Sequence, residues 1–547
     1  MDVKTILDRY GKLNARKSGY WLSLWKDARH YAYPSEESDL TEGGVRGVDL
    51  FDSTAVDARY RLAAGMYAWM APPEQKWFEL QPKDKSLADD DEVKIYFSKV
   101  SSIISEALAN SNWPSVLIQA LNELACGMDA IIYCEDTQDP GDILNFRRYR
   151  VEDVCYSEDA RGAVDTVFIR RKMTARQIAA AFGKDGNLPE EIISCAADQR
   201  RMENEFDILH AVFPRSDRDP EMKDARNMPV ADIYIDLKSK SIIYESGFAE
   251  HPFAVCRFEK SSFESYGRGP GINALPTVKM LNRYAQANVI GTERLADPSY
   301  IAPDGSLMDK EFDRSAGAIN FYKPDINGAK IEQMPNNYNP ALTMQQIDLL
   351  ERKIKEMFFL DIFDPLGDLR NITATEAEIR NESKIVPFAP IAGNLHNELF
   401  RVVIHRVFGI LSRRGMLPEL PEKLAENPEY QVEFVSKIAR ALRKLKVLAW
   451  MQTEASIANI IPIHPDAADN FDYDKIVRDI AIVNGAEPDW LRPAKEVAAL
   501  RQQRQQAQQQ QMAAEQLLAG AGALGQNMGK APEPGSPLGM IMEGNGV

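Results

Sequence analysis

The stretch Phe263-Glu264-Ser265-Tyr266-Gly267-Arg268-Gly269-Pro270-Gly271 decides how this chain is organised. Its three glycines and its proline predict a sharp turn of the backbone, which we call the elbow (Gly267, Arg268, Gly269, Pro270 and Gly271). A helix is predicted over 276–297, because Pro276 suits a first helical turn and because apolar or small residues then recur at helical spacing. These residues are Leu281, Tyr284, Asn288, Gly291 and Leu295.

A second helix is predicted over 341–360, after an irregular connection over 298–340. Ile347, Leu350 and Ile354 keep helical spacing in this second helix, and charged residues occupy its other faces. So long a connection is typical of a functional or a disordered segment. Each helix can bury only a narrow apolar seam. The sequence therefore favours copies that stand side by side, with apolar seams against neighbours and a polar face toward a solvent-filled centre.

The part of the chain before the elbow predicts an α+β body. Its first 126 residues show mostly helical spacing, and Ser53 suits the position just before a helix. From Ile131 to Phe258, short β-branched or aromatic runs alternate with turns, which is typical of antiparallel strands with a helix or two between them. The segment 238–240 is predicted to be a tight hairpin turn. The fold class predicted for the whole chain is α+β and predominantly helical.

The part after the second helix predicts three further regions. A polar loop is expected over 361–373. Thr373 and Glu376 suit a capping box for a long helix within 374–429, which Pro387, Pro390 and Gly393 should kink or break. The region 430–499 is expected to be helical. The region 500–547 is low in complexity and is expected to be disordered, although its Gln-rich start is able to extend a helix.

The bulk composition limits the classes of function. The 547 residues carry a formal net charge of −16, and the isoelectric point is near 5.1. An acidic chain of this kind does not grip nucleic acid over its whole surface, but it can let DNA slide. Five scattered cysteines predict a reducing compartment without disulfides. The most apolar run, Val402 to Leu411, is interrupted by His405 and Arg406, so no transmembrane span is predicted.

The sequence offers little that points to catalysis or to a cofactor. The elbow lacks the Gly-Lys-Ser/Thr end of a phosphate-binding loop, and Pro270 removes an N–H donor, so a structural turn is favoured over nucleotide binding. The six histidines show no metal-ligand spacing, and no Gly-x-Ser-x-Gly motif is present. The acidic run 89–92 is better read as the start of a helix than as a metal site. We therefore expect no enzyme, no cofactor and no metal.

The stretch Phe263-Glu264-Ser265-Tyr266-Gly267-Arg268-Gly269-Pro270 resembles the Glu-Ser-Tyr-Gly-Arg segment that opens the first stem helix in the head-to-tail connector (portal) proteins of short-tailed phages. Four other stretches resemble the same family in the same order along the chain. They are Phe51-Asp52-Ser53-Thr54-Ala55, the helix through Leu62-Ala63-Ala64-Gly65-Met66 that leads to Ala71-Pro72-Pro73, Ile372-Thr373-Ala374-Thr375-Glu376-Ala377, and Leu417-Pro418-Glu419-Leu420-Pro421. No single motif is specific, but the collinear set is, and the resemblance extends to about residue 500.

The resemblance implies a portal fold and an assembly. The expected regions are a wing (1–275), stem helices (276–297 and 341–360), a clip (298–340), a channel loop (361–373), a kinked helix that returns to the wing (374–429), a crown (430–499) and a tail (500–547). It also implies a homo-oligomeric ring of twelve copies in the virion, at a unique capsid vertex, assembled in the host cytoplasm. Double-stranded DNA would pass through this ring in both packaging and ejection, without sequence preference.

The resemblance also implies protein partners, and no membrane. The clip would dock the large terminase subunit and later a tail adaptor, and other surfaces would meet scaffold, major capsid and internal core proteins. Energy for packaging would come from a separate ATPase. Seven basic residues are candidates for the DNA channel, although they are equally suited to ion pairs with acids of adjacent subunits: Lys279, Arg283, Lys323, Lys330, Lys353, Lys355 and Arg370. The alternative is a helix-rich assembly protein, such as a scaffold or tail adaptor, that has no DNA channel.

Overall fold

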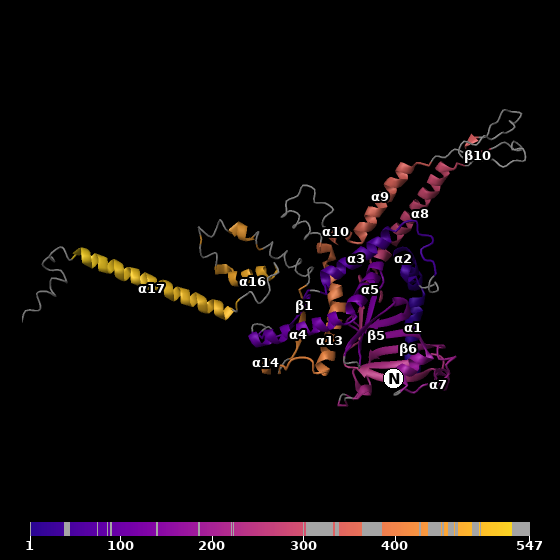
Figure 1. Cartoon of the computed structure of the whole chain (residues 1–547), viewed down its shortest axis with the longest axis horizontal. Coiled ribbons are helices and arrows are strands. Elements are labelled where there is room, and N and C mark those ends of the chain that lie inside the picture. Colours follow the sequence, from indigo (N-terminus) through magenta and orange to yellow (C-terminus); the bar gives the residue numbers. More distant parts are fainter. Residues whose placement is uncertain are drawn as a thin grey trace, which may run out of the picture. The chain divides into compact units, whose positions relative to one another are not determined.

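The computed structural model divides the chain into two compact units, Met1–Leu445 and Lys446–Val547 (Figure 1). It describes residues 2–37, 44–73, 75–84, 86–87, 90–137, 141–183, 186–219, 221–222, 224–298, 300–301, 332–333, 338–363, 385–425, 428–435, 450, 453–457, 464, 469–483, 492 and 494–527. Much of the predicted clip, channel loop and crown therefore lies outside the described residues. Helices and strands occur together, which confirms the α+β class.

The first unit contains a five-stranded antiparallel sheet in sequential order. Its strands are β4 (Val154–Glu158), β5 (Val164–Thr174), β6 (Glu205–Pro214), β7 (Val230–Asp236) and β8 (Ser241–Phe248). Alternating residues along these strands point to opposite faces, so each face carries its own apolar cluster. The helices α6 (Ala175–Phe182) and α7 (Glu190–Ala197) pack on one face, and α1 (Val3–Ser18) packs on the other. The predicted turn at 238–240 joins β7 to β8, with Lys240 at a φ of 55°.

A three-stranded antiparallel sheet packs beside the five-stranded one. Its order is β3-β2-β9, from β3 (Leu144–Tyr149), β2 (Ala130–Asp136) and β9 (Phe253–Cys256). Tyr133 and Phe253 place their rings 6.0 and 5.8 Å from the ring of His210 in β6, which fixes the contact between the sheets. Short 3-10 helices lie at η2 (Val151–Asp153) and η3 (Ala225–Asn227).

Four further helices belong to the first unit, α2 (Trp21–Ala32), α3 (Thr54–Met70), α4 (Asp91–Asn110) and α5 (Trp113–Cys126), and α5 packs against β2 and β3. The 3-10 helix η1 (Pro34–Glu36) follows α2. Arg29 of α2 is 1% exposed and binds two carboxylates, those of Glu123 in α5 (2.9 Å) and Glu152 in η2. Arg148 of β3 pairs with Glu123 as well. Helix and sheet are thus joined by buried charges that come from four separate segments.

The region predicted as a helical crown begins instead with a strand. β12 (Tyr430–Phe434) pairs antiparallel with β1 (Phe78–Pro82), which packs against α4. Aromatic and β-branched residues alternate in β12, and Phe434 stacks on His396 at 3.9 Å. Residues 430–434 therefore form a strand of the first unit, where a helix was expected.

The first long helix starts earlier than predicted. α8 covers Pro270–Ala296, so Pro270 occupies its first turn and Pro276 lies inside it. The reason is that Gly269 is extended, which ends the preceding loop and lets Pro270 open the helix without losing a hydrogen bond. α9 (Pro340–Met357) returns beside α8, and the two-residue strands β10 (Tyr300–Ile301) and β11 (Glu332–Gln333) pair beyond their ends (Figure 1).

The segment after α9 is partly helical where a polar loop was expected. α10 (Leu360–Phe363) packs the ring of Phe363 against Gly65 and Trp69 of α3. Beyond it, the described chain resumes with an irregular helix. Its hydrogen-bond pattern changes from the 3-10 helix η4 (Val386–Phe388) to α12 (Ala389–Asn394), then to the π-helix η5 (Leu395–Phe400) and finally to α13 (Arg401–Arg413). The helix is thus irregular at Pro387 and Pro390, where a kink or break was predicted, and the part of the predicted helix before residue 385 lies outside the described residues. The short α14 (Glu422–Ala425) follows.

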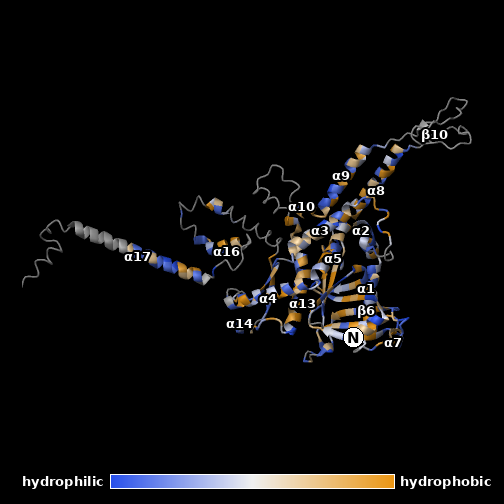
Figure 2. Ribbon diagram, viewed as in Figure 1, coloured by the Kyte–Doolittle hydropathy of each residue, from blue (hydrophilic) through white to orange (hydrophobic). Residues whose placement is uncertain are grey.

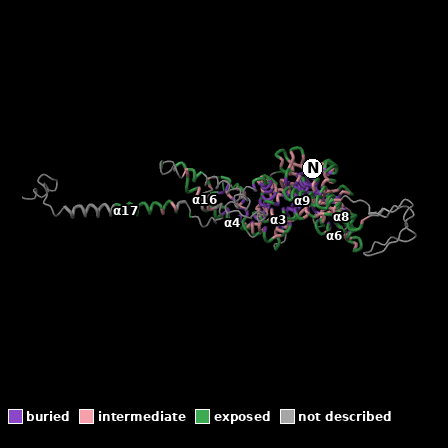
Figure 3. The backbone as a smooth tube through the Cα atoms, turned by 90° about the horizontal axis from the view of Figure 1, so that it is seen from above, coloured by how far each residue is buried: buried purple, intermediate pink, exposed green. Residues whose placement is uncertain are grey.

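The second unit contains α16 (Tyr473–Val483) and α17 (Ala494–Asn527). Arg501 of α17 binds both carboxylate oxygens of Asp474 in α16, at 2.5 and 2.6 Å. Between Glu496 and Met512, no residue of α17 is buried (Figure 3). The Gln-rich start of the region 500–547 extends a helix as far as Asn527, the alternative that the sequence left open, because Ala, Gln, Leu and Arg are good helix formers.

The start of α8 depends on a very close approach to the end of α5. Gly127 closes α5 with a φ of +105°, and a Cβ on Gly271 would lie 2.1 Å from the carbonyl oxygen of Cys126. Gly269 donates its backbone N–H to the carbonyl oxygen of Gly127 at 3.3 Å. The glycines of the elbow are needed for this backbone contact, and not only for the turn that the sequence predicted.

Gly271→Ala is expected to lower the free energy of unfolding by about 1–3 kcal/mol, because the new methyl group must push two backbones apart. The matched control is Gly11→Ala in the middle of α1, where a Cβ would meet nothing within 4 Å. The control is expected to stabilise by about 0.5–1 kcal/mol. Chemical denaturation of both variants tests the claim, and equal effects of the two substitutions would contradict it.

Candidate functional site

The hairpin of α8 and α9 is the part of the first unit that reaches farthest from its sheets (Figure 1). Near the body it has a buried seam, which includes Leu281 of α8 and Leu350 and Ile354 of α9. Near its tip, the Tyr338 hydroxyl donates to the side-chain oxygen of Asn288 at 2.5 Å, and a Cβ on Gly291 would lie 2.7 Å from the Tyr338 ring. Small residues thus let the helices stay close along their length.

The hairpin exposes large apolar side chains along its length. Seven residues are between 40% and 57% exposed: Met280, Val289, Ile290, Leu295, Leu342, Met344 and Leu349. Figure 2 shows that hydrophobic and hydrophilic residues alternate along both helices. Apolar side chains gathered on a projecting element are typical of a surface that binds a partner.

The structure separates the predicted channel residues into paired and unpaired groups. Lys279 binds a carboxylate oxygen of Asp27 in α2 at 2.6 Å, and Lys355 binds Glu351 one turn earlier in α9 at 3.2 Å. Arg283 and Lys353 are exposed and form no ion pair with any described residue. The remaining candidates, Lys323, Lys330 and Arg370, lie outside the described residues.

Sequence reasoning missed one basic residue of α8. Arg294 is exposed and lies eleven residues after Arg283, a spacing that returns to the same helix face after three turns. Like Arg283, it has no ion-pair partner among the residues that the structure describes. The eleven-residue spacing was readable in the sequence. Two exposed guanidinium groups on one face can bind phosphate oxygens in pairs of hydrogen bonds.

The elbow is held by its own side chains and by the body. The Arg268 guanidinium binds both carboxylate oxygens of Glu264, at 3.0 and 2.7 Å, and lies 4.8 Å above the Trp21 ring. The backbone N–H of Arg268 donates to the carbonyl oxygen of Glu259 at 2.8 Å. The guanidinium group and the backbone N–H of Arg268 thus both bind residues of the same chain. The arrangement favours the structural role that we predicted for the elbow.

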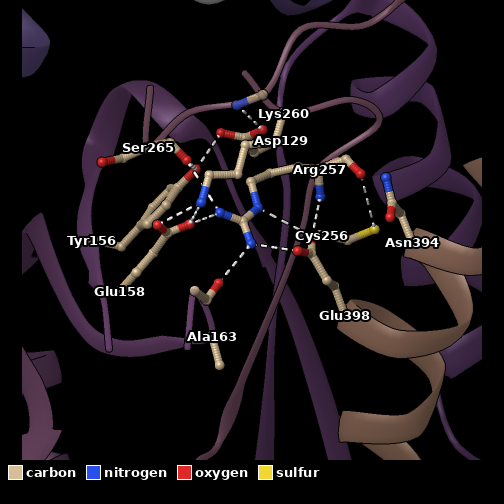
Figure 4. A network of polar contacts seen from close by, with 12 residues as sticks. Asp129, Tyr156, Glu158, Ala163, Cys256, Arg257, Lys260, Ser265, Asn394 and Glu398 are labelled. Carbon is tan, nitrogen blue, oxygen red and sulfur yellow. Dashed lines mark hydrogen bonds and ion pairs between the residues drawn. The ribbon is translucent and has the colours of Figure 1, made fainter. Parts of the chain in front are cut away.

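Just before the elbow, Arg257 joins three segments that are distant in sequence (Figure 4). Its side chain, 2% exposed, binds Glu158 of β4 and Glu398 of η5, and it also donates to the carbonyl oxygen of Gly162 at 3.2 Å. Its backbone N–H donates to Glu398 at 2.9 Å. Lys260 binds both oxygens of Glu158 at 2.6 Å. The loop that leads into α8 is thereby fixed to the sheet and to the irregular helix.

Asp129 completes this network from the other side. One carboxylate oxygen accepts the backbone N–H of Gly267 at 3.0 Å, and the other accepts the Tyr156 hydroxyl at 2.7 Å. Burial raises the pKa of Asp129 to about 7, although these two hydrogen bonds act to lower it. Burial, followed by the nearby Asp129 charge, also raises the pKa of Tyr156, so its hydroxyl stays protonated.

The described residues contain no group of three or more His, Cys, Asp or Glu side chains that could hold a metal ion. Burial raises the pKa values of the Cys126 and Cys134 thiols to about 12, which leaves both without nucleophilic character at neutral pH. Among the helices that the structure describes, none combines the length and apolar character needed to cross a membrane.

The Arg257 network carried no signal in the sequence. Its members Asp129, Tyr156, Glu158, Arg257 and Glu398 are spread over 270 positions and match no motif. Only the elbow that they support was recognisable. Buried charges of this kind can be recognised as a network only from the folded structure, because their residues are far apart in the sequence.

Comparison with known proteins agrees with the resemblance carried by the elbow. A family model described as "Bacteriophage head to tail connecting protein" matches residues 3–491. The chain is 26% identical over 511 residues to a "Probable portal protein" of Bordetella phage BPP-1, which covers 92% of this chain and 91% of that protein. It is also 26% identical over 495 residues to the "Portal protein" of Salmonella phage epsilon15, covering 88% and 87%.

These matches run through the body, the elbow and both helices of the hairpin. Each relative is aligned over most of its own length, so the likeness is one of whole chains and is not limited to a motif. The protein with this anchored, projecting hairpin belongs to the family of bacteriophage head-to-tail connecting proteins.

Proposed function

We propose that this chain is a portal protein, whose copies form a homo-oligomeric ring around a channel for the phage genome. The observation that carries the proposal is the α8–α9 hairpin, which projects from a fixed root and exposes both apolar side chains and arginines that have no ion-pair partner among the described residues. The family membership and the portal names of two relatives support it. By resemblance to the family, the ring would hold twelve copies.

The apolar residues of the hairpin are proposed to form the contact between neighbouring copies. A second copy is the partner that this surface fits, because a contact between two different patches, repeated around an axis, closes into a ring. Leu342 and Leu349 lie seven residues apart on one face of α9, so they place two exposed apolar side chains on that face over two turns. Their burial would contribute about 1.5–3 kcal/mol per fully buried side chain.

The charge of the assembly suits a channel that lets DNA slide. Twelve copies at −16 each would carry a formal charge of −192. This excess would repel phosphate at short range, and salt would screen the repulsion beyond roughly 8 Å. The exposed basic residues Arg283, Arg294 and Lys353 would then make weak contacts that slow the duplex without holding it. Lys323, Lys330 and Arg370 stay candidates for the same role.

The partners of the ring follow from its proposed place in the virion. We propose that residues 298–340 dock the large terminase subunit during packaging and a tail adaptor afterwards. The loop 361–373, with Arg370, is proposed to project into the channel and to affect DNA retention. Scaffold, major capsid and internal core proteins would contact the outer surfaces of the ring at one capsid vertex.

Leu349→Glu is expected to reduce ring assembly at least tenfold, because a carboxylate would have to be buried in each contact between copies. The matched control is Ile193→Glu in α7, where an equally large apolar side chain is 52% exposed, against 57% for Leu349. Mass photometry of the full-length proteins measures the assembled fraction. Rings formed equally well by both variants would contradict the proposed interface.

Negative-stain images along the symmetry axis distinguish the proposal from its alternative. A portal should display an open central passage. A closed centre would favour a scaffold or tail adaptor without a DNA channel.

Replacing Arg283 and Arg294 together by Gln is expected to lower the salt dependence of binding to double-stranded DNA. The slope of log K against log salt concentration should fall by roughly 0.9 for each phosphate that the protein no longer neutralises. The matched control is Arg176→Gln in α6, an exposed arginine that pairs with Glu203 at 2.9 Å. Fluorescence anisotropy at several salt concentrations measures the slope. An unchanged slope in the double variant would contradict a contact between these arginines and DNA. Tight sequence-specific binding would contradict a channel in which DNA slides.

A further inference from the structure

We propose that Asp129 acts as a proton-dependent switch at the root of the hairpin, holding the loop 265–267 more firmly when it is protonated. Nothing in this proposal depends on the ring or on DNA. It rests on the hydrogen-bonding options of three groups and on the charges around them. We call Asp129, Tyr156 and the Ser265 carbonyl group the Asp129 site.

The hydrogen bonds of the site allow two arrangements. The Tyr156 hydroxyl oxygen lies 2.7 Å from a carboxylate oxygen of Asp129 and 3.1 Å from the carbonyl oxygen of Ser265. A hydroxyl group has a single proton to donate, so it cannot satisfy both acceptors. When Asp129 is ionised, the closer and charged acceptor takes this proton. The Ser265 carbonyl is then left with the Arg257 guanidinium at 3.4 Å.

Protonation of Asp129 removes this competition. The carboxyl group then donates its own proton to the Tyr156 hydroxyl oxygen, and Tyr156 is free to donate to Ser265. The other carboxyl oxygen continues to accept the N–H of Gly267, 3.0 Å away. All three groups are satisfied, and the loop gains one hydrogen bond. No atom has to move by more than a hydroxyl rotation.

Burial favours the protonated form of Asp129, and the surrounding charges offset this effect only in part. The charged groups that face Asp129 are Arg257, which follows β9, and Glu398 of η5, while Glu158 and Lys260 complete the network around Arg257. These groups are two cations and two anions, so the net charge of the network is zero when Asp129 is not counted. The neighbouring Tyr156, Tyr266 and Cys256 are neutral, since burial raises the pKa of each. An ionised Asp129 would therefore leave one uncompensated negative charge in a site where it is 1% exposed.

The helix before Asp129 acts in the same direction. α5 ends at Cys126, with Gly127 as its C-cap, so Asp129 follows the negative end of a helix dipole. Burial raises the pKa of Asp129 from an ordinary 3.8 to about 7. Because the pKa is higher in the folded state, the stabilising contribution is fully present below pH 3.8 and is lost as the pH rises through about 7.

The Asp129 site lies close to the start of the hairpin. Ser265 and Gly267 lie three to five residues before Pro270, the first residue of α8. A change in how the loop is held thus acts on the segment from which the hairpin starts. The body is bound separately, through Arg257, Glu158 and Glu398, and does not depend on the proton.

Hydrogen–deuterium exchange of the full-length protein, between about pH 5.5 and about pH 8.5, tests the proposal. After division by the intrinsic exchange rate, protection of the amides in 264–269 is expected to fall roughly two- to tenfold as the pH rises through this range, the equivalent of one hydrogen bond. Protection in Asp129→Asn is expected to be constant, because the amide donates to Tyr156 at every pH. The control Asp153→Asn, which alters an exposed carboxylate paired with Arg150, should keep the wild-type profile.

Two further measurements keep the test decisive. The infrared C=O band of a protonated carboxyl group should be present in the wild type at low pH and should disappear through neutral pH, which needs no variant. Tyr156→Phe should keep this carboxyl titration but lose the pH dependence of loop protection, because the proton state no longer reaches Ser265. A wild-type loop whose protection is constant with pH, or an Asp129→Asn variant that retains the wild-type pH dependence, would overturn the proposal.

Discussion

The backbone contact between the end of α5 and the start of α8 determines how the hairpin leaves the body. At Gly271 the two chains approach so closely that a single methyl group would lie 2.1 Å from a carbonyl oxygen. Such a contact fixes both the position and the direction of α8, because neither backbone can rotate without separating from the other. The Pro270 ring limits the first turn of α8 in the same way. A helix of 27 residues, about 40 Å long, magnifies any change of angle at its base.

Buried charges hold this contact from both sides. Arg29 and Arg257 are each nearly inaccessible, and each binds two carboxylates from different segments. Such groups add little net stability compared with apolar packing, since their desolvation offsets much of the attraction. Their geometry is nevertheless demanding, because any rearrangement leaves a buried charge without its partner. The root of the hairpin is therefore specified by charge pairing, whereas the seam between α8 and α9 is specified by shape.

The sequence predicted the elements well where local chemistry decides them. Helical spacing placed both helices of the hairpin, and runs such as 233–235 and 242–244 lie in strands β7 and β8. The predictions were wrong where contact with a residue distant in sequence determines the secondary structure. Pro276 looked like a helix start, but contact with α5 moves the start to Pro270. Tyr430–Phe434 looked helical in context, but it pairs with β1, almost 350 residues earlier. Asp129 and Glu398 were invisible for the same reason, whereas Arg294 was readable from its spacing to Arg283.

The charged groups that the structure describes are of two kinds: those paired with other residues of the chain, and those exposed without a described partner. In the body, the buried charges are matched by other residues of the same chain, so little of their potential is left for a partner. On the hairpin, Arg283, Arg294 and Lys353 lack ion-pair partners among the described residues, and apolar side chains stand beside them. These side chains, on the part of the hairpin that the structure describes, are the ones that we propose to meet a partner. Asp129 sits at the boundary between the two regions. Among the described residues of the Arg257 network, it is the one carboxylate that forms no ion pair, so a proton there changes the root without disturbing the pairs that hold the body.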